Sequence, residues 1–192
     1  MVLFEKTGKE NTLKTAQIAV AKAKELGCDL VLSSYTGESA RVVLKEAKAV
    51  GFEKKVIVVR GTTTADRKGV FYMDEQTYQE LEKEGAVIVT SAHALSAGER
   101  GISKKHQGAY PLEIMAETLR TFGAGTKVCF ECSVMALDCG ALPYGETIVA
   151  MGGTAEGLDT ALVITPSYSS SILDTVVHEI LCKPALYDRV KK

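Results

Sequence analysis

The sequence lacks any long apolar run. No uninterrupted apolar stretch approaches the roughly 20 residues that a transmembrane helix requires. The segment from Met1 to Lys6 contains neither a basic region followed by an apolar run nor a small-residue cleavage site, so no signal peptide is recognised. We therefore expect a cytoplasmic protein that does not enter a membrane.

An excess of charge of one sign is missing as well. Lysine and arginine number 23, aspartate and glutamate number 24, and the formal net charge is -1. This balance generates no global field that would attract nucleic acid or an anionic membrane surface. Neither is expected as a partner, and any bound phosphate must be held by local groups.

Cysteines are few, odd in number and unevenly spaced. The five cysteines fit free thiols in a reducing cytosol better than a disulfide framework. Cys129, Cys132 and Cys139 fall on one stripe of a predicted helix and are interpreted as small core residues. A zinc site would need a fourth ligand at suitable spacing, so we predict no metal site.

Linkers, charge blocks and internal repeats are also absent, and 192 residues suit a single domain over 1–192. Helical periodicity and capping signals predict helices at 12–26, 39–50, 74–84, 111–122, 126–139 and 170–181. Short apolar runs predict strands at 29–34, 55–59, 86–90, 147–151 and 160–165. This alternation is typical of a three-layer αβα fold of the α/β class, with helices on both faces of a mostly parallel five-stranded sheet.

One segment, 92–110, has weak periodicity and is longer than most loops of compact domains. It carries three glycines beside Arg100, Lys104 and Lys105. The sequence predicts either a lid or partner contact or a disordered insertion.

The strongest local signal is the polar segment between the first predicted strand and the second predicted helix. It reads Ser33-Ser34-Tyr35-Thr36-Gly37-Glu38-Ser39-Ala40. Ligands of open α/β sheets bind beyond the carboxyl ends of the strands, where a helix N-terminus offers free N–H groups and the positive end of its dipole. Hydroxyls of Ser34, Thr36 and Ser39 complete a predicted anion cradle, and Gly37 allows close approach of the backbone. The alternative is that Ser39 only caps the helix and Gly37 only turns the chain.

Three more loops end at the same sheet edge if the strands are parallel. They are Arg60-Gly61-Thr62-Thr63-Thr64, Ser91-Ala92-His93 and Gly152-Gly153-Thr154. Arg60 is a candidate for a charge-assisted contact to phosphate, or is solvated at the end of its strand. Gly152 and Gly153 expose backbone to a ligand, or form a sharp turn before Asp159.

Parts of the sequence resemble those of a known protein family. Residues 27–40, followed by Val56-Ile57-Val58-Val59, are similar to the C-terminal α/β domain of pyruvate kinase, in which such a segment holds the phosphate of a sugar-bisphosphate effector. Over its full length, including Met151-Gly152-Gly153-Thr154 and Gly157-Leu158-Asp159-Thr160-Ala161, the chain resembles stand-alone proteins of this fold from archaea and some other microbes. The kinase barrel has no counterpart here, so pyruvate kinase activity is excluded.

The resemblance implies a five-stranded mixed sheet with one antiparallel edge strand, phosphate contacts from Ser34, Thr36, Gly37 and Ser39, and flavin mononucleotide (FMN) as ligand. Tyr35 and Glu38 depart from the kinase pattern, and a carboxylate beside phosphate disfavours fructose bisphosphate. A flavin ring needs an apolar or aromatic wall. Candidates for that wall are Tyr35, Phe71, Tyr72, Tyr110 and Tyr168.

The sequence therefore predicts a flavoprotein or another binding protein for a phosphate-bearing small ligand, without identifiable catalytic machinery. The predicted contact residues are Ser34, Tyr35, Thr36, Gly37, Glu38, Ser39, Arg60, Gly61, Thr62, Ser91, His93, Gly152, Gly153 and Thr154. One alternative is a small enzyme, either a flavin-dependent redox protein or a phosphoryl-ester hydrolase with Ser91 as nucleophile and His93 as base. Another is an oligomerising module, because the corresponding kinase domain contributes to subunit contacts.

Overall fold

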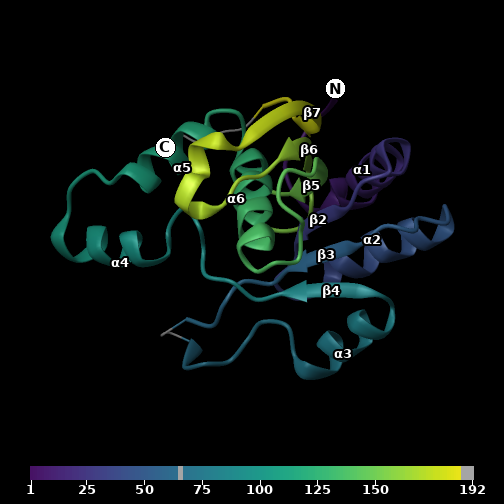
Figure 1. Ribbon diagram of the computed structural model, residues 1–192, viewed down its shortest axis with the longest axis horizontal. Helices are drawn as coiled ribbons and strands as arrows, with labels where there is room; N and C mark the ends of the chain where they lie inside the picture. Colours follow the sequence, from purple (N-terminus) through teal and green to yellow (C-terminus); the bar gives the residue numbers. More distant parts are fainter. Residues whose placement is uncertain (65–66, 187–192) are drawn as a thin grey trace.

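Five short apolar runs form five neighbouring strands of one sheet in the computed structural model, which describes residues 1–64 and 67–186 (Figure 1). The strands are β2 (Leu30–Ser33), β3 (Val56–Val59), β4 (Ala86–Val89), β5 (Ile148–Gly152) and β6 (Thr160–Thr165). All five predicted strands are confirmed. β3 and β5 are buried along their whole length, as expected for strands that are covered on both faces.

Two strands that the sequence did not predict, β1 (Val2–Phe4) and β7 (Val176–Pro184), extend the sheet. The described residues form seven strands in the order β1-β7-β6-β5-β2-β3-β4. β6 is antiparallel to both of its neighbours, and every other pair is parallel. The α/β class is confirmed, but the expectation of five strands with an antiparallel edge strand is wrong, because the antiparallel strand lies inside the sheet.

The predicted helix at 170–181 is also wrong. Residues Ser169–Asp174 form a 3-10 turn, η3, and the chain then continues as β7 beside β6. The apolar spacing of Leu173, Val177 and Ile180 suggested a helix with these side chains inward, yet Leu173 is 83% exposed. Pairing with β6, across two register irregularities, outweighed the local periodicity.

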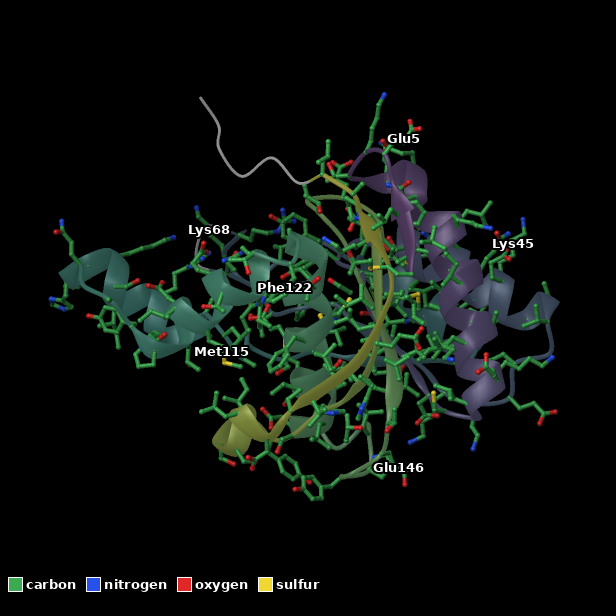
Figure 2. The ribbon with its side chains drawn as sticks, turned by 90° about the horizontal axis from the view of Figure 1, so that it is seen from above. Glu5, Lys45, Lys68, Met115, Phe122 and Glu146 are labelled. Carbon is green, nitrogen blue, oxygen red and sulfur yellow. The ribbon has the colours of Figure 1, made fainter. Side chains whose placement is uncertain are left out.

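Helices cover both faces of the sheet, as Figure 2 shows edge-on. α1 (Thr12–Leu26), α2 (Glu38–Ala49) and α3 (Glu75–Lys83) enclose one apolar core. α5 (Pro111–Arg120) and α6 (Ala124–Asp138) enclose the second core on the other face. These five predicted helices are confirmed, with Gly27 in the left-handed conformation after α1 and Pro111 opening α5.

Part of the segment 92–110 is a helix that the sequence did not predict, α4 (Ala97–His106). It contains no buried residue and lies at one end of the molecule, beside α5 (Figure 1). Polar contacts join the two helices: Ser103 Oγ donates to Glu113 Oε1 at 2.8 Å, and the Glu113 N–H donates to Glu99 Oε2 at 2.9 Å. The weak apolar periodicity is explained by the absence of a buried face.

α6 is nearly surrounded by protein, since it packs between the sheet and α5. Cys129 and Cys132 are buried in it as predicted, but Cys139 is exposed at its end, so the predicted stripe of three core cysteines is wrong. All five cysteines are free thiols. Within 1–64 and 67–186, no helix has the length and apolar character needed to cross a bilayer.

Candidate functional site

The carboxyl ends of β2, β3, β4 and β5 meet at one edge of the sheet, and two cavities open there. The α2 cavity, of about 550 Å³, is lined by Lys9, Thr12, Ser33, Ser34, Tyr35, Thr36, Glu38, Ser39, Val42, Ala155, Glu156 and Gly157. The α6 cavity, of about 240 Å³, is lined by Ser33, Tyr35, Val59, Gly61, His93, Arg120, Ala124, Lys127, Val128, Glu131, Cys132, Met135, Gly153 and Ala155. Three residues, Ser33, Tyr35 and Ala155, line both cavities, so the two adjoin.

The start of α2 forms one wall of the α2 cavity. The Ser34 hydroxyl accepts the Ala40 N–H at 3.4 Å, and the Thr36 hydroxyl accepts the Glu38 N–H at 3.5 Å. In the part of the chain that the structure describes, the N–H of Ser39 has no acceptor. Helix capping therefore accounts for two of the hydroxyls, and it leaves a backbone donor for a ligand.

Gly37 has a different role from the predicted one. Its φ is +91°, and a Cβ there would lie 2.5 Å from Thr77 Cγ2 and 3.2 Å from Leu81 Cδ1. The open side of this glycine is thus filled by α3, not by the cavity. Gly37 lets the chain turn closely against α3, which was the alternative interpretation.

The opposite wall is the turn between β5 and β6. The buried Asp159 carboxylate holds this turn by accepting the N–H groups of Thr154 and Gly8, each at 3.1 Å. Thr12 Oγ1 accepts the Leu158 N–H at 3.0 Å, which joins the turn to α1. The sequence predicts Asp159 only as the residue that follows a turn, although its position directly before the buried strand β6 was a signal for this role.

Charged groups at the mouth of the α2 cavity are mostly acidic. Lys9 is the single cationic side chain lining it among the described residues, and it pairs with Glu156 at 3.7 Å. Both partners are about three-quarters exposed, at 74% and 77%, so this pair stabilises the fold little and is free to rearrange around a ligand. Glu38, which also lines the cavity, is exposed in the first turn of α2.

The two predicted glycines of the third loop occupy different places. Gly152 lies under α6, where a Cβ would be 2.8 Å from the Gly125 carbonyl oxygen, and it lines neither cavity. Gly153 lines the α6 cavity. Thr154 lines neither cavity, and its buried Oγ1 has no hydrogen-bond partner within the described residues. Close packing against α6 therefore accounts for Gly152.

Arg60 is not directed at either cavity. Its guanidinium lies over the ring of Phe71 at 3.8 Å and over Tyr78 at 4.7 Å, and its Nε donates to Thr90 Oγ1 at 2.7 Å. Arg60 therefore lines neither cavity, because cation–π contacts hold its side chain against Phe71 and Tyr78. Its neighbour Gly61 lines the α6 cavity against the Tyr35 ring, whereas Thr62 lines neither cavity.

The predicted Ser91–His93 pair is not formed either. Ser91 Oγ donates to the Ala92 carbonyl oxygen at 3.2 Å. His93 instead bonds through Nε2 to the Tyr35 hydroxyl at 2.7 Å and through Nδ1 to Glu131 Oε2 at 3.1 Å. Glu131 is the orienting acid that no local motif revealed, since 38 residues separate it from His93.

Glu131 is the most highly connected side chain of this group. It is buried in α6, pairs with Lys127 one helical turn earlier, and accepts the Leu95 N–H at 3.0 Å. Burial alone would raise the pKa of Glu131, but the hydrogen bond to His93 and the charge of Lys127 outweigh it and lower the pKa to about 2. An ionised Glu131 requires the proton of neutral His93 on Nδ1, so Nε2 accepts the Tyr35 hydroxyl.

Tyr35 stands between the two cavities. Burial, with smaller contributions from Cys132 and Glu131, raises the pKa of Tyr35 to about 12. Burial also raises the pKa of the Cys132 thiol to about 12. Both side chains therefore stay protonated at neutral pH, and Cys132 offers no thiolate.

Of the aromatic residues predicted as a wall for a flavin ring, Tyr35 alone lines the α2 cavity. Phe71 covers Arg60, and Tyr72 packs edge-on against Tyr35 with ring centroids 5.8 Å apart. Tyr168 stacks on Tyr144, and Tyr110 lines a separate groove along α5.

No model of a known protein family matches this chain, so the resemblance to stand-alone pyruvate kinase C-terminal domain-like proteins stays a prediction from its residues.

Proposed function

We propose that the protein binds a small phosphate-bearing ligand in the α2 cavity, with the phosphate at the N-terminus of α2. The observation that carries this proposal is the cavity itself, which joins the polar segment 33–39 to the turn at 155–157. The free Ser39 N–H and the helix dipole would face the anion there. Helix capping would not require the segments 33–39 and 155–157, which are far apart in the sequence, to come together at one cavity.

FMN is the ligand we propose first. A cavity of about 550 Å³ lies within the range of sites for small molecules and cofactors, roughly 300 to 1,000 Å³. Tyr35 and Val42 supply aromatic and apolar surface for the ring, while Thr12, Ser33 and Thr36 supply hydroxyls for a polyol chain. Lys9 would turn from Glu156 toward the phosphate.

The test begins with freshly purified protein. A yellow preparation that releases FMN on denaturation would support the proposal directly. For colourless protein, melting temperature is measured with FMN, riboflavin and inorganic phosphate, and we expect FMN to stabilise more than riboflavin because only FMN carries the phosphate. The proposal fails if the protein is colourless and none of these compounds raises the melting temperature.

A negative charge introduced into the α2 cavity tests whether the ligand binds there. Thr36 lines the cavity and is exposed, so Thr36→Glu would set a carboxylate beside the phosphate without disturbing the core. Thr64 is exposed but lies outside both cavities, which makes Thr64→Glu the matched control. We expect at least about tenfold weaker FMN binding for Thr36→Glu alone, since a tenfold change needs only about 1.4 kcal/mol. Equal affinities of the two variants would place the ligand elsewhere.

A further inference from the structure

The α6 cavity contains a chain of three hydrogen-bonded groups, and two of them, His93 and Glu131, take no part in ligand binding in the α2 cavity. Tyr35, His93 and Glu131 follow one another at 2.7 Å and 3.1 Å, and Tyr35 lines both cavities. The order hydroxyl, imidazole, carboxylate is that of an acid–base relay, in which the carboxylate orients the ring and the ring exchanges a proton with the hydroxyl.

The relay is held rigidly from several sides. Glu131 is fixed by Lys127 and by the Leu95 N–H, and the His93 ring stacks near that of Tyr35 with centroids 6.3 Å apart. Packing of α6 alone does not require a carboxylate at Glu131, because an apolar residue at this buried position would avoid the cost of desolvating a charge. At the other end of the relay, Tyr35 lines both cavities.

We propose that the α6 cavity is an acid–base site in which Tyr35 donates a proton to the carbonyl oxygen of a phosphorylated ketone or aldehyde. This inference rests on the proposed function, since the phosphate would be held in the adjoining α2 cavity. Tyr35 is the catalytic residue because it touches the substrate. His93 and Glu131 are positioning and proton-supplying residues that act through it.

The chemical step is enolisation. When His93 takes up a proton on Nε2, the ring donates to the Tyr35 oxygen instead of accepting from it, and the Tyr35 hydroxyl hydrogen is released toward the carbonyl oxygen. The Tyr35 hydroxyl then gives this proton to the carbonyl oxygen, and the His93 imidazolium returns a proton from Nε2 to the tyrosine oxygen. Water accepts the proton from the carbon beside the carbonyl, and the electron pair of that C–H bond becomes the C=C bond of the enol. The ionised Glu131 stabilises the imidazolium before the transfer, and Arg120 and Lys127 supply positive charge along the cavity.

Tyr35 suits the role of acid better than that of nucleophile. Its hydroxyl stays protonated at neutral pH, since burial raises the pKa of Tyr35 to about 12. A phenolate nucleophile would therefore be scarce, whereas the protonated hydroxyl is the form present at neutral pH.

The test uses hydroxyacetone phosphate as probe and follows loss of its C–H signals in D₂O by NMR. We expect faster exchange with the wild-type protein than without protein, and little acceleration for hydroxyacetone, which lacks the phosphate. Tyr35→Phe should lose at least about 100-fold of the acceleration, the lower end of the usual contribution of a general acid. Tyr144→Phe, at an exposed tyrosine outside both cavities, is the matched control and should keep it.

Glu131→Gln tests positioning. It should lower the maximal exchange rate with little change in the KM for the probe, and ¹⁵N NMR should show that His93 no longer holds its proton on Nδ1. If Glu131→Gln does not fold, the wild-type ¹⁵N spectrum decides alone, because a neutral His93 protonated on Nε2 would overturn the relay.

Binding of the probe, followed through the Ser39 amide signal, separates the two proposals. Binding without accelerated exchange, or equal exchange by Tyr35→Phe and wild type, would overturn the acid–base site and leave the phosphate site standing. Absence of probe binding would overturn the acid–base site, whereas the phosphate site is decided separately by the melting temperatures with FMN, riboflavin and inorganic phosphate.

Discussion

Acid should destabilise this protein through Glu131 in a way that can be calculated. A carboxyl whose pKa falls from 4.5 to about 2 on folding stabilises the folded state by about 3 kcal/mol at pH values above 4.5. The unfolded chain binds the proton first as pH falls, so this stabilisation is lost between pH 4.5 and about 2. About 2 kcal/mol should already be lost at pH 3.

The variant that tests this is Lys127→Met/Glu131→Gln. Glu131→Gln alone would leave the Lys127 charge buried without its counter-ion, which costs about 3 to 5 kcal/mol. The double variant removes both charges, so its stability at neutral pH should stay closer to that of the wild type. Exposed carboxylates titrate alike in both proteins and cancel in the comparison.

Urea unfolding at pH 6, 4 and 3 provides the measurement. We expect the free energy of unfolding to fall by about 2 kcal/mol more for the wild type than for the double variant between pH 6 and pH 3. Parallel pH dependences of the two proteins would refute the reasoning, because they would show that Glu131 ionises alike in the folded and unfolded chains.

Three further changes have defined outcomes. Gly153→Ala places a Cβ 2.1 Å from a carbonyl oxygen and should lower the melting temperature by several degrees, whereas Gly98→Ala, with open space around it in a helix, should not lower it. Asp74→Ala removes the cap of α3, whose carboxylate accepts the Thr77 N–H at 2.7 Å, and should cost about 1 kcal/mol in urea unfolding. Glu38→Gln should strengthen FMN binding in a titration, because it removes a carboxylate from the cavity that we assign to phosphate.

Local signals predicted most of the helices and the central strands. Asp74 caps α3, Gly27 follows α1, and Pro111 opens α5, and each acts within a few residues of its own position. β7 was mistaken for a helix because its apolar spacing fits a helix as well, and β1 was missed because it is only three residues long.

The candidate site was predicted in part. Ser34, Thr36 and Ser39 do line one cavity, as expected from their place after a buried strand. Arg60 lines neither cavity, and nothing in the sequence shows that Phe71 and Tyr78 would cover its guanidinium. The spacing of Lys127 and Glu131 by four residues was a readable sign of a helical ion pair, but it does not show that the pair is buried.

Periodicity, caps and turn residues are properties of neighbouring residues, so the chain alone specified an alternating α/β order and placed a hydroxyl-rich turn after β2. Contacts between distant segments followed from the packing of helices on the sheet. That packing decided that β6 runs antiparallel inside the sheet, that Asp159 holds the far wall of the α2 cavity, and that Glu131 meets His93 and Tyr35. No short stretch of sequence contains these contacts, because each depends on how several elements pack at once.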